Sequence, residues 1–311
     1  MSIKLFIQTD KFKGGPAVFR SRLISELNKY EDIKVITNVE KKFDIELAFI
    51  RNVYKHNKPY ILRVDGCYYM EKKLSNEPLK KAIKNAKYLI FQSKFSFELC
   101  KKVLDLGDNL KYSIIYNGVD SNYIEQIKPH PKIPPGSFVS CGRWRDNKRP
   151  MSTIRGFLEA DTKRHLYMIG GQGLGGKKID KKYNSKYVHV LDKKSLKNTI
   201  SIMKACDYQI HLCHIDSCPN TVVEGLACGL NTLCTNLGGT KELVRENGVI
   251  LEVDKWWKGK QMKSQKLDNL NKKVVAEGIH KVINIKQRSM RKDLDIKSTA
   301  FKYIDIIKKH V

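Results

Sequence analysis

The sequence predicts an α/β protein with two similar domains, each built on a mostly parallel sheet with helices on both faces. At 311 residues the chain is long for a single core. Short apolar runs alternate with amphipathic stretches, which is the pattern of such sheets. The alternation stops at Lys128–Gly136, where four prolines can continue neither a helix nor a central strand, and then restarts. We therefore expect a first domain over residues 1–130, a second over 134–290, and a closing helix over 291–311 that returns to the first.

The first domain is expected to begin with a strand, a Gly-Gly-Pro loop and a helix that is apolar on one side. Further apolar runs continue the alternation. The expected strands are 3–9, 33–37, 45–50, 60–64, 88–92 and 113–116, and the expected helices are 17–28 and 95–104.

The second domain repeats this pattern after the prolines. The expected strands are 138–141, 165–169, 187–191, 208–212 and 231–235, and the expected helices are 151–158, 196–205, 221–227 and a short one from Lys241. The segment from Lys255 to Lys292 is strongly basic and has Trp256 and Trp257 at its start. Apolar residues at helical spacing within 299–311 predict the closing helix.

The composition excludes several classes of protein. The chain has no apolar run long enough to predict a membrane-spanning helix, and its start lacks the features of a signal peptide. We therefore expect a cytoplasmic protein, with peripheral contact to a membrane as the alternative. Eight cysteines without a CxxC pair do not predict a disulfide framework. The densest group of cysteine and histidine, His211–Cys218, fits no zinc spacing, so we expect ordinary packing there and no metal site.

The net charge is unusually positive. The chain carries 59 basic and 32 acidic residues, a balance of +27 that favours a polyanionic partner such as nucleic acid, an anionic membrane or a phosphorylated glycan. A bias toward lysine codons is the alternative explanation for part of this excess.

The segment Asp216–Gly229 carries the clearest chemical signal. It follows an expected strand and enters an expected helix, with Pro219 and Asn220 at the turn. A helix N-terminus offers unpaired N–H groups and the positive end of a dipole, which suits a phosphate. Asp216 and Glu224 bracket the turn and can face one ligand. The alternative is a helix cap followed by a solvated glutamate.

This segment resembles the E-x7-E segment of the retaining family-four glycosyltransferases, with Asp216 in place of the first glutamate. Those enzymes have the GT-B fold, in which two Rossmann-like domains face each other across a cleft. Other segments resemble family motifs in the same order along the chain, from about residue 3 to residue 252. They are the glycine loop Gly14-Gly15, Phe91–Ser93, the N-G-V-D segment Tyr116–Asp120, the G-R-x-x-x-x-K segment Gly142–Pro150, and Leu237–Glu242.

The resemblance implies a sugar nucleotide as donor, with a UDP-sugar favoured, transfer with retention of configuration, and no cofactor or metal. Arg143 and Lys148 would neutralise the diphosphate, Asp216 would contact sugar hydroxyls and Glu224 the ribose. Backbone groups near Cys218, Asn220 and Thr221 would hold phosphate or sugar, and Gly14 and Gly15 would let the first loop approach the phosphates. The change from glutamate to Asp216 shortens one arm by a methylene.

The acceptor side is expected at Ile61–Tyr69, where a strand ends in charged residues and glycine. We expect Arg63 and Asp65 to line it, with Asp65 as hydrogen-bond acceptor for the incoming hydroxyl. Many relatives carry a histidine near this position. The alternative is an aspartate that caps a turn.

Two further motifs match by pattern alone. Gly171–Gly176 reads GxGxxG, but the lysine-rich stretch behind it has almost no apolar face, which argues against a dinucleotide site. Asp293-Leu-Asp295 reads DxD, the metal motif of another glycosyltransferase fold, but it lies in a charged region and is expected to be solvated.

Two classes of acceptor fit the charge. One is a hydroxylated base in DNA, as in viral-type DNA modification, and the other is a lipid-linked or surface glycan at an anionic membrane. The lysine-rich segment 177–194 serves either, and Trp256-Trp257 could stack on bases, lie at a membrane interface or pack between domains. We favour nucleic acid because the charge is spread along the chain. A binding module that has lost catalysis is the third alternative.

Overall fold

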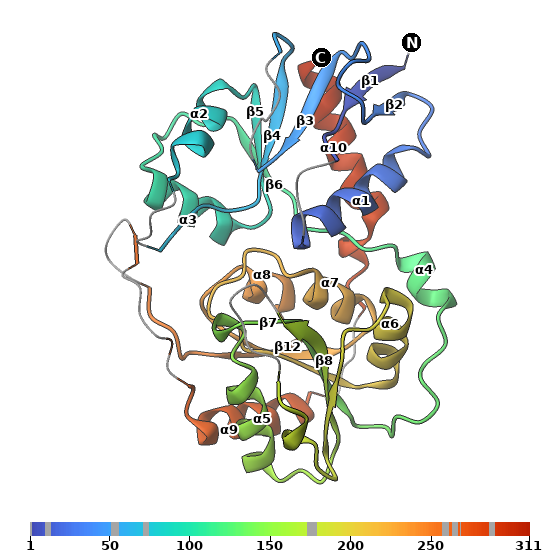
Figure 1. The fold of residues 1–311 in the computed structure, drawn as a ribbon, viewed down its shortest axis with the longest axis vertical. Helices are drawn as coiled ribbons and strands as arrows, with labels where there is room; N and C mark the ends of the chain where they lie inside the picture. The colour runs from blue at the N-terminus through green and yellow to red at the C-terminus, as the bar shows by residue number, and fades with distance from the viewer. Residues whose placement is uncertain are drawn as a thin grey trace. The chain divides into compact units, whose positions relative to one another are not determined.

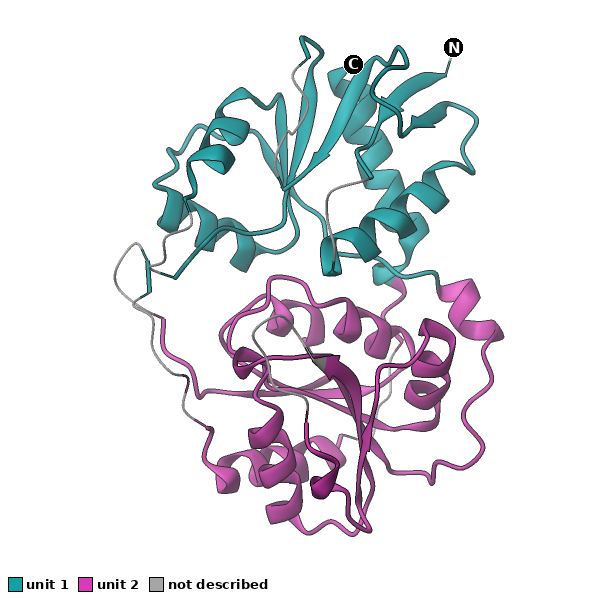
Figure 2. Cartoon of the chain, in the orientation of Figure 1, with its two compact units in different colours: residues 1–120, 257–265, 293–311 teal, residues 121–256, 266–292 magenta. Residues whose placement is uncertain are grey.

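The computed structural model describes residues 2–9, 14–50, 56–70, 75–172, 179–256, 261–262, 267, 269–285 and 290–311. The chain divides into two compact units (Figure 2). Unit 1 comprises residues 1–120, 257–265 and 293–311, and unit 2 comprises residues 121–256 and 266–292. Among the described helices, none is long and apolar enough to cross a membrane.

Unit 1 contains a sheet of six parallel strands in the order β2-β1-β3-β4-β5-β6 (Figure 1). The strands are β1 (Ile3–Phe6), β2 (Ile33–Ile36), β3 (Ile45–Phe49), β4 (Tyr60–Val64), β5 (Tyr88–Phe91) and β6 (Tyr112–Ile114). The helices are α1 (Gly15–Leu27), α2 (Glu77–Asn85), α3 (Lys94–Leu104) and α10 (Ile296–His310). β3 and β4 are buried along their whole length, as expected for central parallel strands with both faces covered.

The last helix of the chain completes the core of unit 1. Phe19 of α1 lies against Tyr303 of α10, with ring centroids 6.1 Å apart. Tyr303 and Ile307 are fully buried in the same cluster as Leu47 and Ile61 of the sheet. The α10 helix begins at Ile296 because Asp295 caps it, its side chain accepting from the Lys297 N–H at 2.7 Å.

Unit 2 contains a second sheet of six parallel strands, in the order β12-β11-β10-β7-β8-β9. The strands are β7 (Phe138–Trp144), β8 (Leu166–Gln172), β9 (Val188–Leu191), β10 (Tyr208–His211), β11 (Asn231–Thr235) and β12 (Gly248–Leu251). The helices are α4 (Ser121–Gln126), α5 (Pro150–Ala160), α6 (Leu196–Ala205), α7 (Asn220–Ala227), α8 (Thr240–Val244) and α9 (Lys272–Ile283). Short 3-10 turns lie at Asp146–Lys148, Lys181–Tyr183 and Lys292–Leu294.

Two parallel sheets with flanking helices confirm the predicted fold class. The sequence reading missed α2, α4, β12 and α9. α9 lies inside the strongly basic segment, where lysines hide an apolar face made by Val275, Ile279 and Val282, all of which are fully buried. The proline-rich segment 128–136 belongs to unit 2, where the Ser201 hydroxyl donates to the Lys128 carbonyl at 2.9 Å. The boundary between the units lies earlier, at Asp120.

Candidate active site

Two loops meet at one edge of the sheet of unit 2. β7 and β10 are parallel neighbours, so their carboxyl ends lie at the same edge. β7 leads into the turn Asp146–Lys148 and then into α5, and β10 leads through residues 212–219 into α7. The carboxyl edge of such a sheet is where α/β proteins bind ligands. The site therefore rests on two segments that are far apart in sequence.

Lys148 and Asp216 join these two loops. The Lys148 ammonium donates to the Asp216 carboxylate, and the two side chains are 14% and 23% exposed. Burial alone would lower the pKa of Lys148, but the Asp216 carboxylate outweighs it and the pKa is raised. Burial opposes the charge of Asp216 as well, yet the Lys148 ammonium holds the pKa of Asp216 below its usual value. Both groups are therefore charged at neutral pH.

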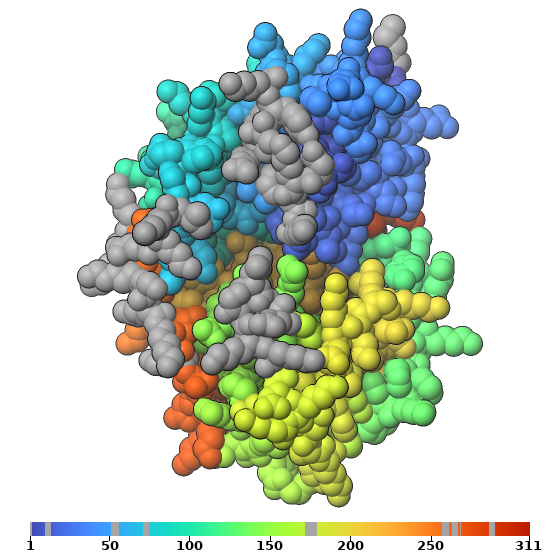
Figure 3. Space-filling model, viewed as in Figure 1, coloured from blue at the N-terminus to red at the C-terminus, as the bar shows by residue number. Residues whose placement is uncertain are grey.

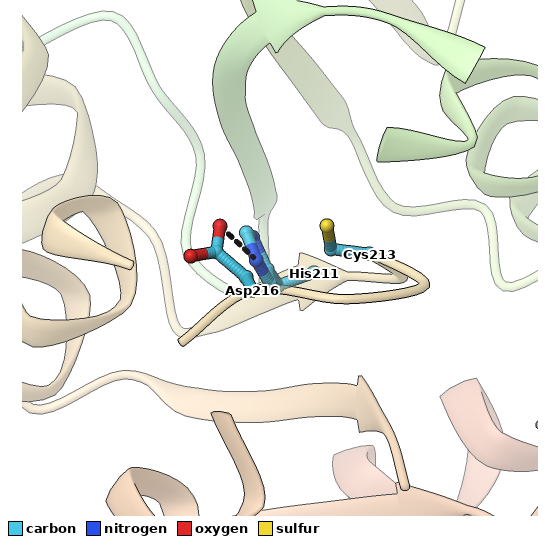
Figure 4. A group of neighbouring side chains, drawn as sticks. All are labelled: His211, Cys213 and Asp216. Carbon is cyan, nitrogen blue, oxygen red and sulfur yellow. Dashed lines mark ion pairs between the residues drawn. The ribbon is translucent and has the colours of Figure 1, made fainter. Parts of the chain in front are cut away.

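His211 and Cys213 complete the cluster (Figure 4). The ligand atoms of His211, Cys213 and Asp216 all lie within 4.8 Å of one another, and His211 Nε2 is 3.8 Å from Asp216 Oδ2. Burial, aided by the Lys148 charge, lowers the pKa of His211 to about 3, so the imidazole is neutral. Burial likewise raises the pKa of the Cys213 thiol to about 11, and this thiol donates to the Ile215 carbonyl at 3.3 Å.

The cluster is balanced in charge without a metal ion. Its residue types would suit zinc, but the Lys148 ammonium already contacts the Asp216 carboxylate. A metal ion bound through Asp216 would have to displace this ammonium and deprotonate a thiol whose pKa is raised. The expectation of ordinary packing for His211–Cys218 was incomplete, because two of its residues surround the Lys148–Asp216 pair.

A second network lies behind this pair and was missed by the sequence reading. The Arg149 guanidinium donates to both carboxylate oxygens of Asp254, at 2.8 and 2.7 Å. The ring Nδ1 of His214 lies 2.9 Å from Asp254 Oδ1. The backbone N–H of His214 donates to the Asn147 carbonyl at 2.8 Å. Arg149 is 6% exposed and adopts a left-handed conformation, with φ of 47°, at the start of α5. The network therefore holds the turn that carries Lys148 against the loop that carries Asp216.

A glycine turn after β11 supports the backbone of Asp216. The Gly239 N–H donates to the Asp216 carbonyl at 2.9 Å. Gly238 has φ of 141°, and a Cβ built there would lie 3.0 Å from the same carbonyl oxygen. The segment Leu237–Glu242 thus needs glycine at this position for both conformation and space.

The remaining residues expected to bind the donor occupy the same region of unit 2. Arg143 lies on β7 with an exposed side chain, and within the described residues this side chain makes no hydrogen bond or ion pair. Glu224 lies in α7, is 5% exposed, and contributes to the raised pKa of the Cys141 thiol on β7, after burial. Its burial contradicts the alternative of a solvated glutamate. The residue that caps α7 is Pro219, so Asp216 is not a helix cap.

The N-terminus of α7 lies directly after this loop. Cys218 is buried, whereas Asn220 and Thr221 are half-buried in the first turn of the helix. Pro219 offers no N–H and no side-chain cap. The positive end of the helix dipole therefore lies shortly after Asp216 in the chain and suits an anion.

In unit 1, Arg63 and Asp65 form a buried ion pair at the end of β4. Arg63 Nη1 lies 2.6 Å from Asp65 Oδ1, and the Arg63 side chain is fully buried over the Phe19 ring. Burial raises the pKa of Asp65 despite the neighbouring arginine. Arg63 also donates to Asn117 at 2.7 Å. This burial leaves Arg63 no surface for an acceptor. Neither carboxylate oxygen of Asp65 accepts a hydrogen bond from the described residues, which contradicts the turn-cap alternative.

Other motifs have structural explanations. Gly14, with φ of 90°, precedes α1, which begins at Gly15. Gly118 lies against α10, where a Cβ would approach Thr299 Oγ1 to 2.7 Å, and the Val119 N–H donates to the Leu294 carbonyl at 3.0 Å.

The two motifs that match by pattern alone are Asp293-Leu-Asp295 and Gly171–Gly176. Asp293 is exposed, and Asp295, which is half-buried, caps α10 through a hydrogen bond at the surface. Of Gly171–Gly176, residues 173–176 lie outside the described residues, as does Trp257, whereas Trp256 is 38% exposed.

Comparisons with known proteins identify the family of this chain. A family model described as "Glycosyl transferases group 1" matches residues 125–298, which is more than half of the chain. A comparison with curated proteins finds no match.

Solved structures share the fold at low sequence identity. HepE from Anabaena in complex with UDP is 15% identical, with a TM-score of 0.68 over 99% of this chain and 100% of that one. HepE in complex with UDP-glucose is 14% identical, with a TM-score of 0.66 over 99% of this chain and 100% of that one. Sucrose-phosphate synthase from Thermosynechococcus elongatus is 10% identical, with a TM-score of 0.69 over 99% of each chain. From the family match and the shared GT-B fold, we conclude that the chain belongs to the group 1 glycosyl transferases and is a glycosyltransferase.

Proposed function

We propose that this glycosyltransferase takes its sugar from a nucleotide-diphosphate sugar bound to unit 2. The observation that carries the proposal is the Lys148–Asp216 pair, in which Lys148 comes from the turn after β7 and Asp216 from the loop that enters α7. A lysine held in its charged form beside a helix N-terminus is suited to a diphosphate. The complexes of HepE with UDP and UDP-glucose favour a UDP-sugar as the donor.

The two members of the pair are proposed to recognise different parts of the donor, Lys148 the diphosphate and Asp216 the sugar. When a diphosphate binds, its negative charge takes over from Asp216 as partner of Lys148. The Asp216 carboxylate is then available to accept hydrogen bonds from sugar hydroxyls. Arg143, which is exposed on β7, is the second cation for the departing diphosphate. Both cations act most strongly on the charge that develops as the sugar–phosphate bond breaks.

Glu224 and the backbone around Cys218, Asn220 and Thr221 are proposed to hold the ribose and the phosphates. The burial of Glu224 gives its carboxylate a fixed position. In unit 1, Gly14 and Gly15 are proposed to serve the phosphates, and Asp65 the incoming hydroxyl. Transfer is proposed to proceed with retention and without a metal, the diphosphate departing on the face that the acceptor enters.

The acceptor is proposed to be polyanionic, and a hydroxylated base in DNA is favoured over a glycan at an anionic membrane. The net charge of +27 supports a polyanion. This excess is spread along the sequence, and nucleic acid needs a broad basic footprint.

Hydrolysis of a panel of UDP-, GDP- and ADP-sugars by the purified protein tests the donor proposal. We expect slow release of the nucleoside diphosphate from one of them, abolished in Lys148→Ala and Glu224→Ala. The anomeric form of the released sugar tests retention. A protein that binds a sugar nucleotide tightly but neither hydrolyses nor transfers it would be the inactive binding module.

A further inference from the structure

A cavity lies in unit 2, away from the candidate donor site. It measures about 550 Å³ and is lined by Pro131, Lys132, Ile133, Pro134, Pro135, His165, Tyr167 and His189. This volume falls within the range of small-molecule sites, roughly 300–1,000 Å³. Tyr167 and His189 are each the second residue of their strand, β8 and β9. The cavity is therefore at the amino edge of the sheet, roughly 15 Å along β8 from the carboxyl edge.

The sheet side of this cavity is a surface of nearly parallel rings. Tyr167 and His189 are paired across β8 and β9, and their ring centroids are 4.7 Å apart with 19° between the planes. The His165 and His189 rings lie 11° apart, and His165 Nδ1 is 2.8 Å from His189 Nε2. This hydrogen bond needs one nitrogen as donor and the other as acceptor, so at least one imidazole is neutral. The rings are half-buried and fixed by their neighbours.

Cations surround these rings. Lys132 lines the cavity and is exposed. Lys186 lies over the Tyr187 ring at 5.2 Å, and Tyr187 meets His165 edge-on with centroids 5.7 Å apart. The described residues of 161–200 include eight lysines and arginines and three aspartates, of which Lys163, Arg164, Lys186 and Asp161 flank the amino ends of β8 and β9. The part of this segment from residue 179 onward lies on the face of unit 2 seen in Figure 3.

We propose that this surface, called here the ring face, binds a single strand of nucleic acid, with one base in the cavity. It is defined by Lys132, Lys163, His165, Tyr167, Lys186 and His189. Proteins that bind single strands combine aromatic side chains, on which bases stack, with a basic groove along the phosphates. The rings and prolines offer a base two flat walls, and the lysines contact the phosphates. The inference rests on the proposed polyanionic acceptor and assigns it to nucleic acid.

The shape of the ring face separates nucleic acid from a membrane. Anchoring at a bilayer requires apolar side chains that project into the lipid. Here the half-buried rings line a cavity together with Pro131, Pro134 and Pro135, and the prominent groups are lysines such as Lys163, which is 64% exposed. A base on a flexible strand can enter such a recess, whereas a flat anionic bilayer contacts only the lysines.

Binding of a short fluorescein-labelled oligothymidylate to the full chain, measured by anisotropy against salt, tests the proposal. The triple variant Lys132→Glu/Lys163→Glu/Lys186→Glu should weaken binding at least tenfold. It should also reduce the salt slope by roughly two, since each single-strand phosphate contact contributes about 0.7. The matched control, Lys81→Glu/Lys84→Glu/Lys87→Glu, makes the same charge change on exposed lysines of unit 1 and should weaken binding far less.

The ring contribution is tested separately. Tyr167→Leu should weaken oligonucleotide binding about tenfold through lost stacking. Tyr167→Phe keeps the ring and should bind like the unaltered protein. Equal loss in both lysine triples, equal affinity of Tyr167→Leu, or binding to phosphatidylserine vesicles without binding to the oligonucleotide would each overturn the proposal. Sugar-nucleotide hydrolysis by the unaltered protein is scored independently, so failure of the ring face is distinguished from failure of the donor proposal.

Discussion

Arg149 and Asp254 are 105 residues apart in sequence, yet the guanidinium of one donates to both carboxylate oxygens of the other. His214 shares the same carboxylate at 2.9 Å. Because Arg149 follows Lys148 and His214 precedes Asp216 by two residues, this buried pair fixes the separation of the two side chains that are proposed to bind the donor. We regard Arg149, His214 and Asp254 as positioning residues.

Asp254→Asn should lower both stability and transfer. Removing one partner of a buried pair leaves the other charge uncompensated and costs about 3–5 kcal/mol of unfolding free energy. Urea denaturation checks this loss. The released turn should also raise the donor KM, because Lys148 is no longer held opposite Asp216.

The control is Asp305→Asn on α10. Asp305 pairs with Lys309, which is 65% exposed, so this substitution should change the free energy of unfolding by about 0.5 kcal/mol or less. An Asp254→Asn protein with normal stability and normal KM would show that the network has no positioning role.

Gly238→Ala should affect the same site through the backbone. The left-handed φ of 141° and the 3.0 Å approach to the Asp216 carbonyl leave no room for a methyl group. Strain of this kind costs on the order of 1–3 kcal/mol. We expect a lower midpoint in urea and weaker donor binding by titration with UDP. Gly107→Ala is the matched control, because a Cβ there meets nothing within 4 Å. Similar effects of the two substitutions would contradict this explanation of the glycine turn.

The sequence was sufficient for the fold class and for half of the site. Buried parallel strands such as β3 are uniform apolar runs and need no tertiary information to identify. β12 was missed although its sequence, Gly-Val-Ile-Leu, is apolar, because so short a run does not by itself distinguish a strand from other structure. Lys148 and Asp216 could be found because each lies beside a strand end within a motif.

The other half of the site depends on distant partners. The short apolar run that predicts β10 assigns His211 to core packing, and nothing in its spacing shows that Lys148 lies beside it. Asp254 follows a strand that was itself missed. Arg63 illustrates the opposite error, because a charged residue at a strand end was expected to face a ligand but is held in the core by Phe19 and Asp65.

His211 should make stability depend on pH. Burial lowers the pKa of folded His211 to about 3, whereas an unfolded histidine titrates near about 6.5. Below the unfolded value the unfolded state binds a proton that the folded state does not, so stability is lost as pH falls toward the folded pKa. Between about pH 7 and about pH 5 the loss from this one group is roughly 2 kcal/mol.

Unfolding in urea at these two pH values checks the prediction, with His211→Gln as the test variant. The variant should lose less stability than the unaltered protein over this interval. His130→Gln is a control in a half-buried position of the proline segment. An identical pH dependence in His211→Gln and the unaltered protein would show that His211 is not held neutral.

The Lys148–Asp216 pair allows chemistry and stability to be separated. Lys148→Met and Asp216→Asn should each reduce transfer on the order of 10²–10³-fold, the usual effect of losing one preorganised contact to developing charge. Each should also cost roughly 1–3 kcal/mol of unfolding free energy, less than for a fully buried pair because both side chains keep some exposure. In the double variant no unpaired charge remains, so stability should recover in part while transfer stays lost. Urea unfolding and initial rates of sugar-nucleotide turnover, measured on the same preparations, provide the two readouts. Recovery of turnover together with stability would mean that the pair only supports the fold, and that Lys148 and Asp216 do not act on the donor.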